Sequence, residues 1–219
     1  MNAPNSFVRH VFAVALLVGL AWVFSLGRAD LPPVHFWNRI LADAGFALLC
    51  LILLIGPLGR FFPAINSLLP FRRELGIAFA VAATLHVLAY ARSFDFDLTR
   101  FFVGTEHHET ILLANAFASA NWIGLVALAY GLILALTSND FSQRLLGRGW
   151  KFLQQQSYTL FILVFLHTGI LVYLVIHAGY GIFRPIFWGL GGFTIILQLA
   201  GYLRTVVLQS RLRHPRSES

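Results

Sequence analysis

The chain carries very little charge for its length. Only 11% of its 219 residues are Asp, Glu, Lys or Arg, whereas a soluble domain carries roughly 25%. Hydrophobic residues make up 58% of the chain and the mean hydropathy is +0.75. Such a chain lacks the polar groups that cover a globular surface in water, but in lipid it would not need them. The composition predicts an integral membrane protein.

Cysteine is almost absent as well. The single residue, Cys50, lies in an apolar run, which excludes a disulfide framework and any cysteine-based zinc or iron–sulfur site. No G-x-G-x-x-G, P-loop, G-x-S-x-G or H-E-x-x-H motif occurs in a usable context. The sequence therefore gives no support to a nucleotide enzyme, a kinase or a protease.

What the chain does have is an excess of positive charge. Its net charge is +7 and its pI is near 10.3, values that occur in nucleic-acid-binding proteins. Here, however, the cations stand at the ends of apolar runs, where they act as topology signals in a membrane. We expect membrane lipid, and no nucleic acid, around this chain.

Six apolar stretches are each long enough to cross a bilayer core of ~30 Å, which needs ~20 helical residues. They cover residues 8–27, 36–58, 74–92, 112–137, 153–178 and 185–208. Prolines separate several of them, and Pro57, Pro63 and Pro70 are expected to bracket the second connection. The prediction is an all-α six-helix transmembrane bundle, with one domain over 1–210 and a basic cytoplasmic tail over 211–219. No loop is long enough for a separate flavin or nicotinamide domain.

The distribution of Lys and Arg predicts the orientation. If the N-terminus is cytoplasmic, eleven of the 16 cations lie on the inner side and five on the outer side. The positive-inside rule then places both termini in the cytoplasm, and we expect a multi-pass protein of the bacterial inner membrane.

Two of the eight histidines lie deep inside the apolar stretches, where a metal-binding side chain marks function by default. His86 and His167 belong to spans that run in the same direction, and both lie ~18–21 Å from the cytoplasmic end by helix rise. At that shared depth the two neutral imidazoles could bind opposite faces of one haem iron. Taken singly, each histidine could instead be a core residue bonded to a backbone carbonyl. No role is assigned to His10, His35, His107, His108, His177 or His214.

Several short segments carry a family resemblance, over about residues 41–168. These are Ile55-Gly56-Pro57-Leu58-Gly59-Arg60, Arg72-Arg73-Glu74-Leu75-Gly76 leading to Leu85-His86, and Thr137-Ser138 leading to Trp150 and His167. With them the chain resembles the ferric reductase-like transmembrane family, and within it the haem-binding membrane subunits of bacterial periplasmic methionine sulfoxide reductase systems.

The resemblance implies a cytochrome b-like bundle in which His86 and His167 are the axial ligands of haem b. It also implies electron transfer from a cytoplasmic-side flavin, flavin reductase or quinol to a periplasmic reductase or other protein acceptor. The family usually has a further histidine thirteen residues before the second ligand, but Gln154 stands there, and Arg72 occupies the matching depth on the third span. Neither is a normal haem ligand, so one haem is expected and a second is in doubt.

Gln154 with Arg72 and Arg73 could instead form a rim that receives a quinone or the flavin FMN. The alternative for this rim is a belt of side chains that snorkel to the interface. An alternative for the whole chain is a non-catalytic membrane subunit that keeps the fold with a reduced haem complement. A transporter is disfavoured, since the spans lack the paired acidic residues of an ion path.

Overall fold

The computed structural model describes residues 5–93, 95–97, 102, 111–175 and 183–213. The helices are α1 (Ser6–Ser25), α2 (Pro33–Phe61), the 3₁₀ helix η1 (Pro63–Phe71), α3 (Arg72–Arg92), α5 (Ile111–Leu136), α6 (Asp140–Leu146), α7 (Arg148–Gln155), α8 (Ser157–Ile170), the π-helical segment η2 (Leu171–Val175) and α9 (Phe183–Arg213). No strand occurs within these ranges.

Within the described ranges, six helical stretches are long and apolar enough to span a membrane, as the sequence predicts. They cover Ser6–Ser25, Pro33–Phe61, Pro63–Arg92, Asn115–Leu136, Arg148–Tyr173 and Phe183–Gln209. The predicted all-α six-span class is confirmed. Of the stretch expected at 153–178, residues 176–178 lie outside the described part of the chain.

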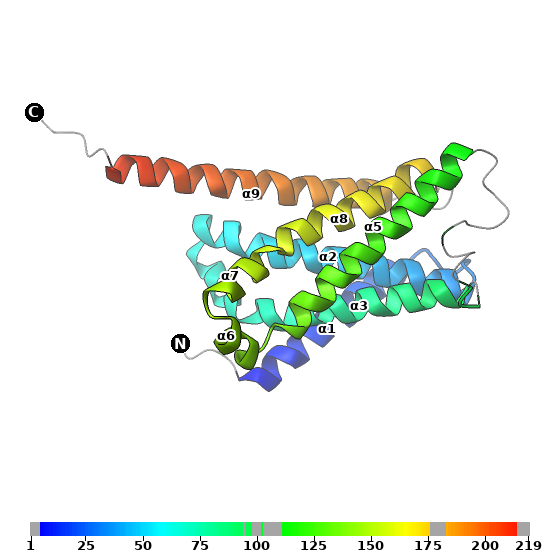
Figure 1. Ribbon diagram of the computed structural model, residues 1–219, viewed down its shortest axis with the longest axis horizontal. Helices are drawn as coiled ribbons and strands as arrows, with labels where there is room; N and C mark the ends of the chain where they lie inside the picture. The colour runs from blue at the N-terminus through cyan, green and yellow to red at the C-terminus, as the bar shows by residue number, and fades with distance from the viewer. Residues whose placement is uncertain (1–4, 94, 98–101, 103–110, 176–182, 214–219) are drawn as a thin grey trace, which may run out of the picture.

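Helix α2 is the centre of the bundle. It packs against α1, α3 and α9, while α5 packs against α3 and α8 (Figure 1). Of the 18-residue apolar stretch within α2, 72% is buried inside the bundle, compared with 11% of the corresponding stretch of α1. Small residues, among them Ala44, Gly45 and Ala47, are buried along α2, and such residues let helix backbones approach closely in a membrane.

The proline prediction for the second connection is wrong in part. Pro57 lies inside α2, which continues to Phe61, and Pro70 lies inside η1. A proline within a helix leaves the carbonyl four residues earlier without its usual donor. Here that carbonyl belongs to Leu53, and the Gln198 side chain of α9 donates a 2.6 Å hydrogen bond to it. The neighbouring helix supplies the missing donor, so α2 can pass through Pro57.

Two buried ion pairs fasten the N-terminal part of the chain. Arg9 of α1 donates to Glu74 of α3 at 2.8 Å, and Glu74 is only 2% exposed. Arg28, which follows α1, pairs with Asp43 of α2, and its guanidinium lies 3.7 Å from the ring centre of Phe183 on α9. An unpaired charge buried inside the bundle would be costly, so each ion pair holds its two parts of the chain in one arrangement.

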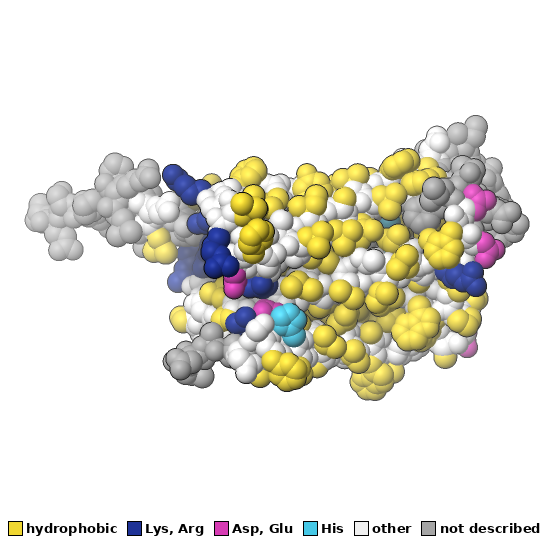
Figure 2. All heavy atoms as spheres, turned by 60° about the horizontal axis from the view of Figure 1, so that its bottom comes forward, with side chains coloured by type: hydrophobic (Ala, Val, Ile, Leu, Met, Phe, Trp, Pro, Cys, Tyr) yellow, Lys and Arg dark blue, Asp and Glu magenta, His cyan; other side chains and the backbone are white. Residues whose placement is uncertain are grey.

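The surface of the bundle suits a lipid environment. Figure 2 shows hydrophobic side chains over the middle of the visible face, with Lys and Arg side chains gathered towards the two ends. The beginning of α1 and the end of α9 lie at the same end of the bundle, together with α6 and α7 (Figure 1). A chain that crosses a membrane an even number of times must have its first and last spans begin and end on the same side. That this side is the cytoplasm stays a prediction.

Candidate functional site: two facing histidines

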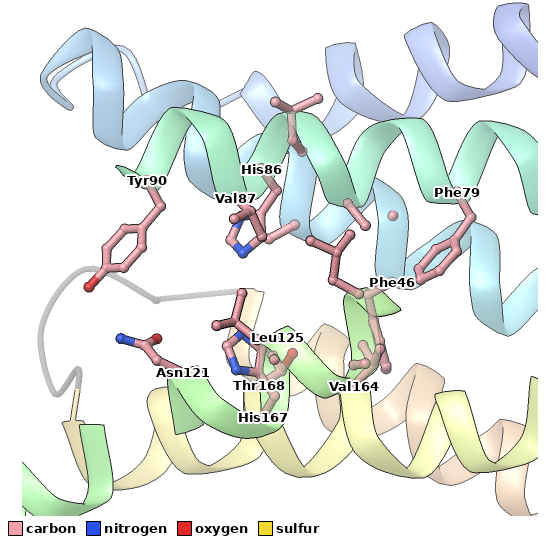
Figure 3. A pocket seen from close by; sticks show the side chains of 17 residues that line it. Phe46, Phe79, His86, Val87, Tyr90, Asn121, Leu125, Val164, His167 and Thr168 are labelled. Atoms are coloured by element: carbon pink, nitrogen blue, oxygen red, sulfur yellow. The ribbon is translucent and has the colours of Figure 1, made fainter. Parts of the chain in front are cut away.

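His86 on α3 and His167 on α8 face one another across the inside of the bundle. Their ring centroids are 6.4 Å apart and their planes cross at 74° (Figure 3). The two side chains line one cavity, the histidine cavity, which is bounded by α2, α3, α5 and α8. The two histidines that the sequence singles out therefore lie side by side, while their role as haem ligands stays a prediction.

The spacing matches the requirement of a shared metal. A metal–imidazole nitrogen bond is about 2 Å long, and that nitrogen lies about 1 Å from the ring centre. Two imidazoles on opposite sides of one metal thus have centroids roughly 6 Å apart, close to the 6.4 Å seen here. The distance between the two rings is therefore compatible with one iron between them.

Backbone carbonyls orient both rings. Nδ1 of His86 donates to the Asn38 carbonyl oxygen at 2.9 Å, and Nδ1 of His167 donates to the Ala120 carbonyl oxygen at 2.6 Å. Metal-bound histidines usually donate their second ring N–H in this way, which fixes the tautomer and leaves Nε2 as the ligand. Each ring is thus bonded to a backbone carbonyl through Nδ1, which leaves Nε2 without that bond, and the reading of the two histidines as metal ligands stays a prediction.

Close approach of α5 is what positions His167. A Cβ atom at Gly124 would lie 2.7 Å from Cε1 and Nδ1 of the His167 ring, nearer than a real Cβ can come. Ala120, Gly124 and Ala127 form a run of small residues along one side of α5, a pattern that lets membrane helices pack tightly. Beyond His167 the helix changes to the π-helical segment η2, a distortion that is frequent at functional sites.

The rest of the histidine cavity is mostly apolar. Phe46 and Phe79 lie at one end, and Tyr90 and Asn121 lie at the other (Figure 3). Its volume is about 90 Å³, below the roughly 300–1,000 Å³ of typical ligand sites, so a porphyrin would have to displace lining side chains such as Leu125. The ligand geometry fits a haem directly, and the cavity fits it only after side-chain movement.

Two aromatic residues of α8 lie beside the histidine cavity without lining it. Phe161 and Phe165 on α8 do not line the histidine cavity but stack with Phe46 and, in the case of Phe165, also with Phe187 of α9. They belong to an aromatic cluster behind the cavity wall, so their role is packing.

A second cavity of about 640 Å³ contains the predicted rim. Arg72, Arg73 and Gln154 all line it, together with Lys151, and we call it the basic cavity. Arg73 pairs with Asp140 at 2.8 Å. Gln154 donates to the Leu134 carbonyl and the Thr137 hydroxyl of α5, at 3.4 and 3.3 Å. The structure thus brings the three rim residues together, but it also engages Gln154 in holding α7 and α8 to α5.

The other histidines take no part in either cavity where they can be placed. His10 bonds to the Ser6 carbonyl on α1 and is exposed, as is His35. His107, His108, His177 and His214 lie outside the described residues.

Four residues of the site carried no recognised signal. Ala120 acts through its backbone carbonyl, which no side-chain pattern marks, and Asn38 acts both through its carbonyl and through its side-chain amide, which donates to the His86 carbonyl at 3.2 Å. Gly124 is one of many membrane glycines. Asn121 was detectable in principle, because it is a buried polar residue inside an apolar span.

Comparison with known proteins agrees with this geometry. Residues 41–165 match the family described as ferric reductase like transmembrane component, and the chain belongs to that family. It is also similar to proteins named protein-methionine-sulfoxide reductase heme-binding subunit MsrQ from Salmonella arizonae and Salmonella paratyphi B. With each it shares 29% identity over 160 residues, which cover 72% of this chain and 75% of the relative.

Proposed function

We propose that this protein is a membrane electron-transfer subunit that holds one haem b between His86 and His167. The observation that carries the proposal is the facing pair, with centroids 6.4 Å apart and each Nδ1 bonded to a backbone carbonyl. Membership of the ferric reductase-like family and the haem-binding name of the Salmonella relatives support it. A bound haem would supply a one-electron couple inside the bilayer.

The chain's own residues do the remaining work. The carbonyls of Asn38 and Ala120 keep the imidazoles aligned, and Gly124 leaves room for the ring of His167. The apolar lining keeps water from the site, and burial together with axial ligation determines the potential of the couple. One domain over 1–210 with a cytoplasmic tail over 211–219, in the bacterial inner membrane, is the arrangement we propose around it.

Haem content tests this assignment. The purified wild-type protein should give a b-type pyridine haemochrome at one haem per chain, and His86→Ala and His167→Ala should each abolish it. The exposed His35→Ala is the matched control and should keep full haem content. A wild type without haem, or alanine variants that keep it, would contradict the proposal.

We further propose that electrons enter from a cytoplasmic-side flavin or quinol at the basic cavity and leave to a periplasmic protein partner. The cationic and amide groups of Arg72, Arg73 and Gln154 suit a flavin (FMN) or quinone head group, and Phe79 lines both cavities. An Arg72→Gln/Arg73→Gln variant should keep its haem and be reduced at least tenfold more slowly by the donor. Unchanged reduction kinetics would argue for a belt of interfacial side chains.

One observation favours a second candidate. Gln154 stands where the family usually has a further histidine, and its amide is bonded to α5. This suits a non-catalytic subunit that keeps the fold with a reduced haem complement and organises a larger complex. Stable co-purification with a partner complex, without a redox-active haem, would support that reading over electron transfer.

A further inference from the structure

The histidine cavity has one polar end and one apolar end. Apart from the histidines, the polar side chains in its lining are Tyr90, Asn121 and Thr168. Tyr90 and Asn121 face each other at one end, while Phe46 and Phe79 lie at the opposite end (Figure 3). Tyr90 is one helical turn beyond His86 on α3, and Asn121 directly follows Ala120, whose carbonyl holds His167. Each polar residue is thus tied to the backbone turn that positions one histidine.

Asn121 is too deeply placed to be a surface residue. It is only 5% exposed, and its side chain is hydrogen-bonded to Tyr90. Burying an amide and a phenol within an apolar span costs free energy unless each of them forms a hydrogen bond. They bond to each other at this end of the cavity, and a phenol and an amide are both groups that can donate a hydrogen bond to a carboxylate.

A haem has the same division between a polar and an apolar edge. Its two propionate carboxylates lie on one edge, and its vinyl and methyl groups lie on the other. Carboxylates within a bilayer need hydrogen-bond donors. In this cavity the side-chain donors that lie at one end, away from the two histidines, are those of Tyr90 and Asn121 (Figure 3).

We infer that Tyr90 and Asn121 are positioning residues that receive the haem propionates and so fix which way round the macrocycle sits. This inference rests on the proposed haem site. The apolar edge then faces Phe46 and Phe79, on the side of the basic cavity that Phe79 also lines. In this orientation the edge with the vinyl and methyl groups would lie nearer the basic cavity, where the donor is proposed to bind. The edge with the carboxylates would lie nearer the C-terminal end of α3.

Haem loss from the holoprotein to a scavenging apoprotein tests the inference. Tyr90→Phe and Asn121→Leu should each increase the haem dissociation constant about tenfold, since each removes a hydrogen bond to a charged group. Tyr130→Phe is the matched control, because Tyr130 lies on α5 outside the lining of both cavities, and it should leave haem retention unchanged. When the proteins carry the haem dimethyl ester instead, the three variants should retain it like the wild type.

Asn121→Asp separates this role from a simple helix contact. It is nearly isosteric, so the fold should survive, but it places an anion beside the propionates. We expect weaker haem retention, and the dimethyl ester should abolish this effect because it has no charged carboxylates for the new anion to repel. Equal retention of native haem by wild type, Asn121→Leu and Asn121→Asp would overturn the inference while leaving the proposed function intact. Absence of haem from the wild type would instead overturn the proposed function.

Discussion

At the scale of single residues, the site depends on groups that no sequence motif contains. His86 and His167 could be predicted because a histidine in lipid is rare and their depths match. Their hydrogen-bond acceptors could not, since any residue has a backbone carbonyl and only the folded helix places those of Asn38 and Ala120 beside the rings. The two histidines were therefore visible in the sequence, and the groups that orient them were not.

Gly124 provides the sharpest residue-scale prediction. In Gly124→Ala the new Cβ would lie 2.7 Å from the His167 ring, so the imidazole must move from its position opposite His86. Overpacking of this kind costs about 1–3 kcal/mol, which corresponds to a roughly fivefold to hundredfold loss of haem affinity. Haem titration of the purified variant measures it.

The control for that variant is Gly192→Ala on α9, where a new Cβ would meet nothing within 4 Å. It should bind haem like the wild type. Equal affinity in both alanine variants would show that α5 does not hold His167 in place.

At the scale of helices, composition and length predict the spans well, because ~20 apolar residues in lipid have few alternatives to a helix. The ends are less predictable. Pro57 reads as a helix break in the sequence, yet α2 continues past it because Gln198 of α9 supplies a donor to the Leu53 carbonyl. That compensation comes from a residue more than a hundred positions away, so a local pattern cannot reveal it.

A double-mutant cycle tests this helix contact. Gln198→Leu should destabilise the bundle by about 0.6–1.7 kcal/mol, the range for interhelical hydrogen bonds in membranes. In a Pro57→Ala background the helix regains its own N–H donor to Leu53, so the same Gln198→Leu change should cost little. Unfolding in detergent measures both steps, and equal costs in the two backgrounds would refute the coupling.

At the scale of the whole molecule, the proposed path of electrons across the membrane rests on the two cavities and the distribution of charge. The basic cavity is lined by Arg72, Arg73 and Lys151, whereas the histidine cavity is apolar apart from its few polar groups, and Phe79 lies in the wall of both. The sequence predicted the rim residues as a group. It could not predict that they enclose about 640 Å³, since a cavity depends on how four or more helices pack.

The orientation of this path is testable directly. Eleven of 16 cations fall on the side predicted to be cytoplasmic, the side that also carries the described beginning of α1 and end of α9 (Figure 1). A green fluorescent protein fused after Ser219 should fluoresce, and alkaline phosphatase fused there should be inactive. Fusions in the loop between α3 and α5 should show the reverse. The opposite pattern would place the basic cavity at the outer face and exclude a cytoplasmic donor there.

The most direct measurement of the central claim is the low-temperature electron paramagnetic resonance spectrum of the oxidised protein, recorded with its haem-to-protein ratio. Two imidazoles crossed at 74° on one ferric iron should give a single, strongly anisotropic low-spin signal at one haem per chain. His86→Ala and His167→Ala should remove that signal. A high-spin signal, two distinct low-spin signals, or a signal that survives both substitutions would contradict a single haem held between His86 and His167.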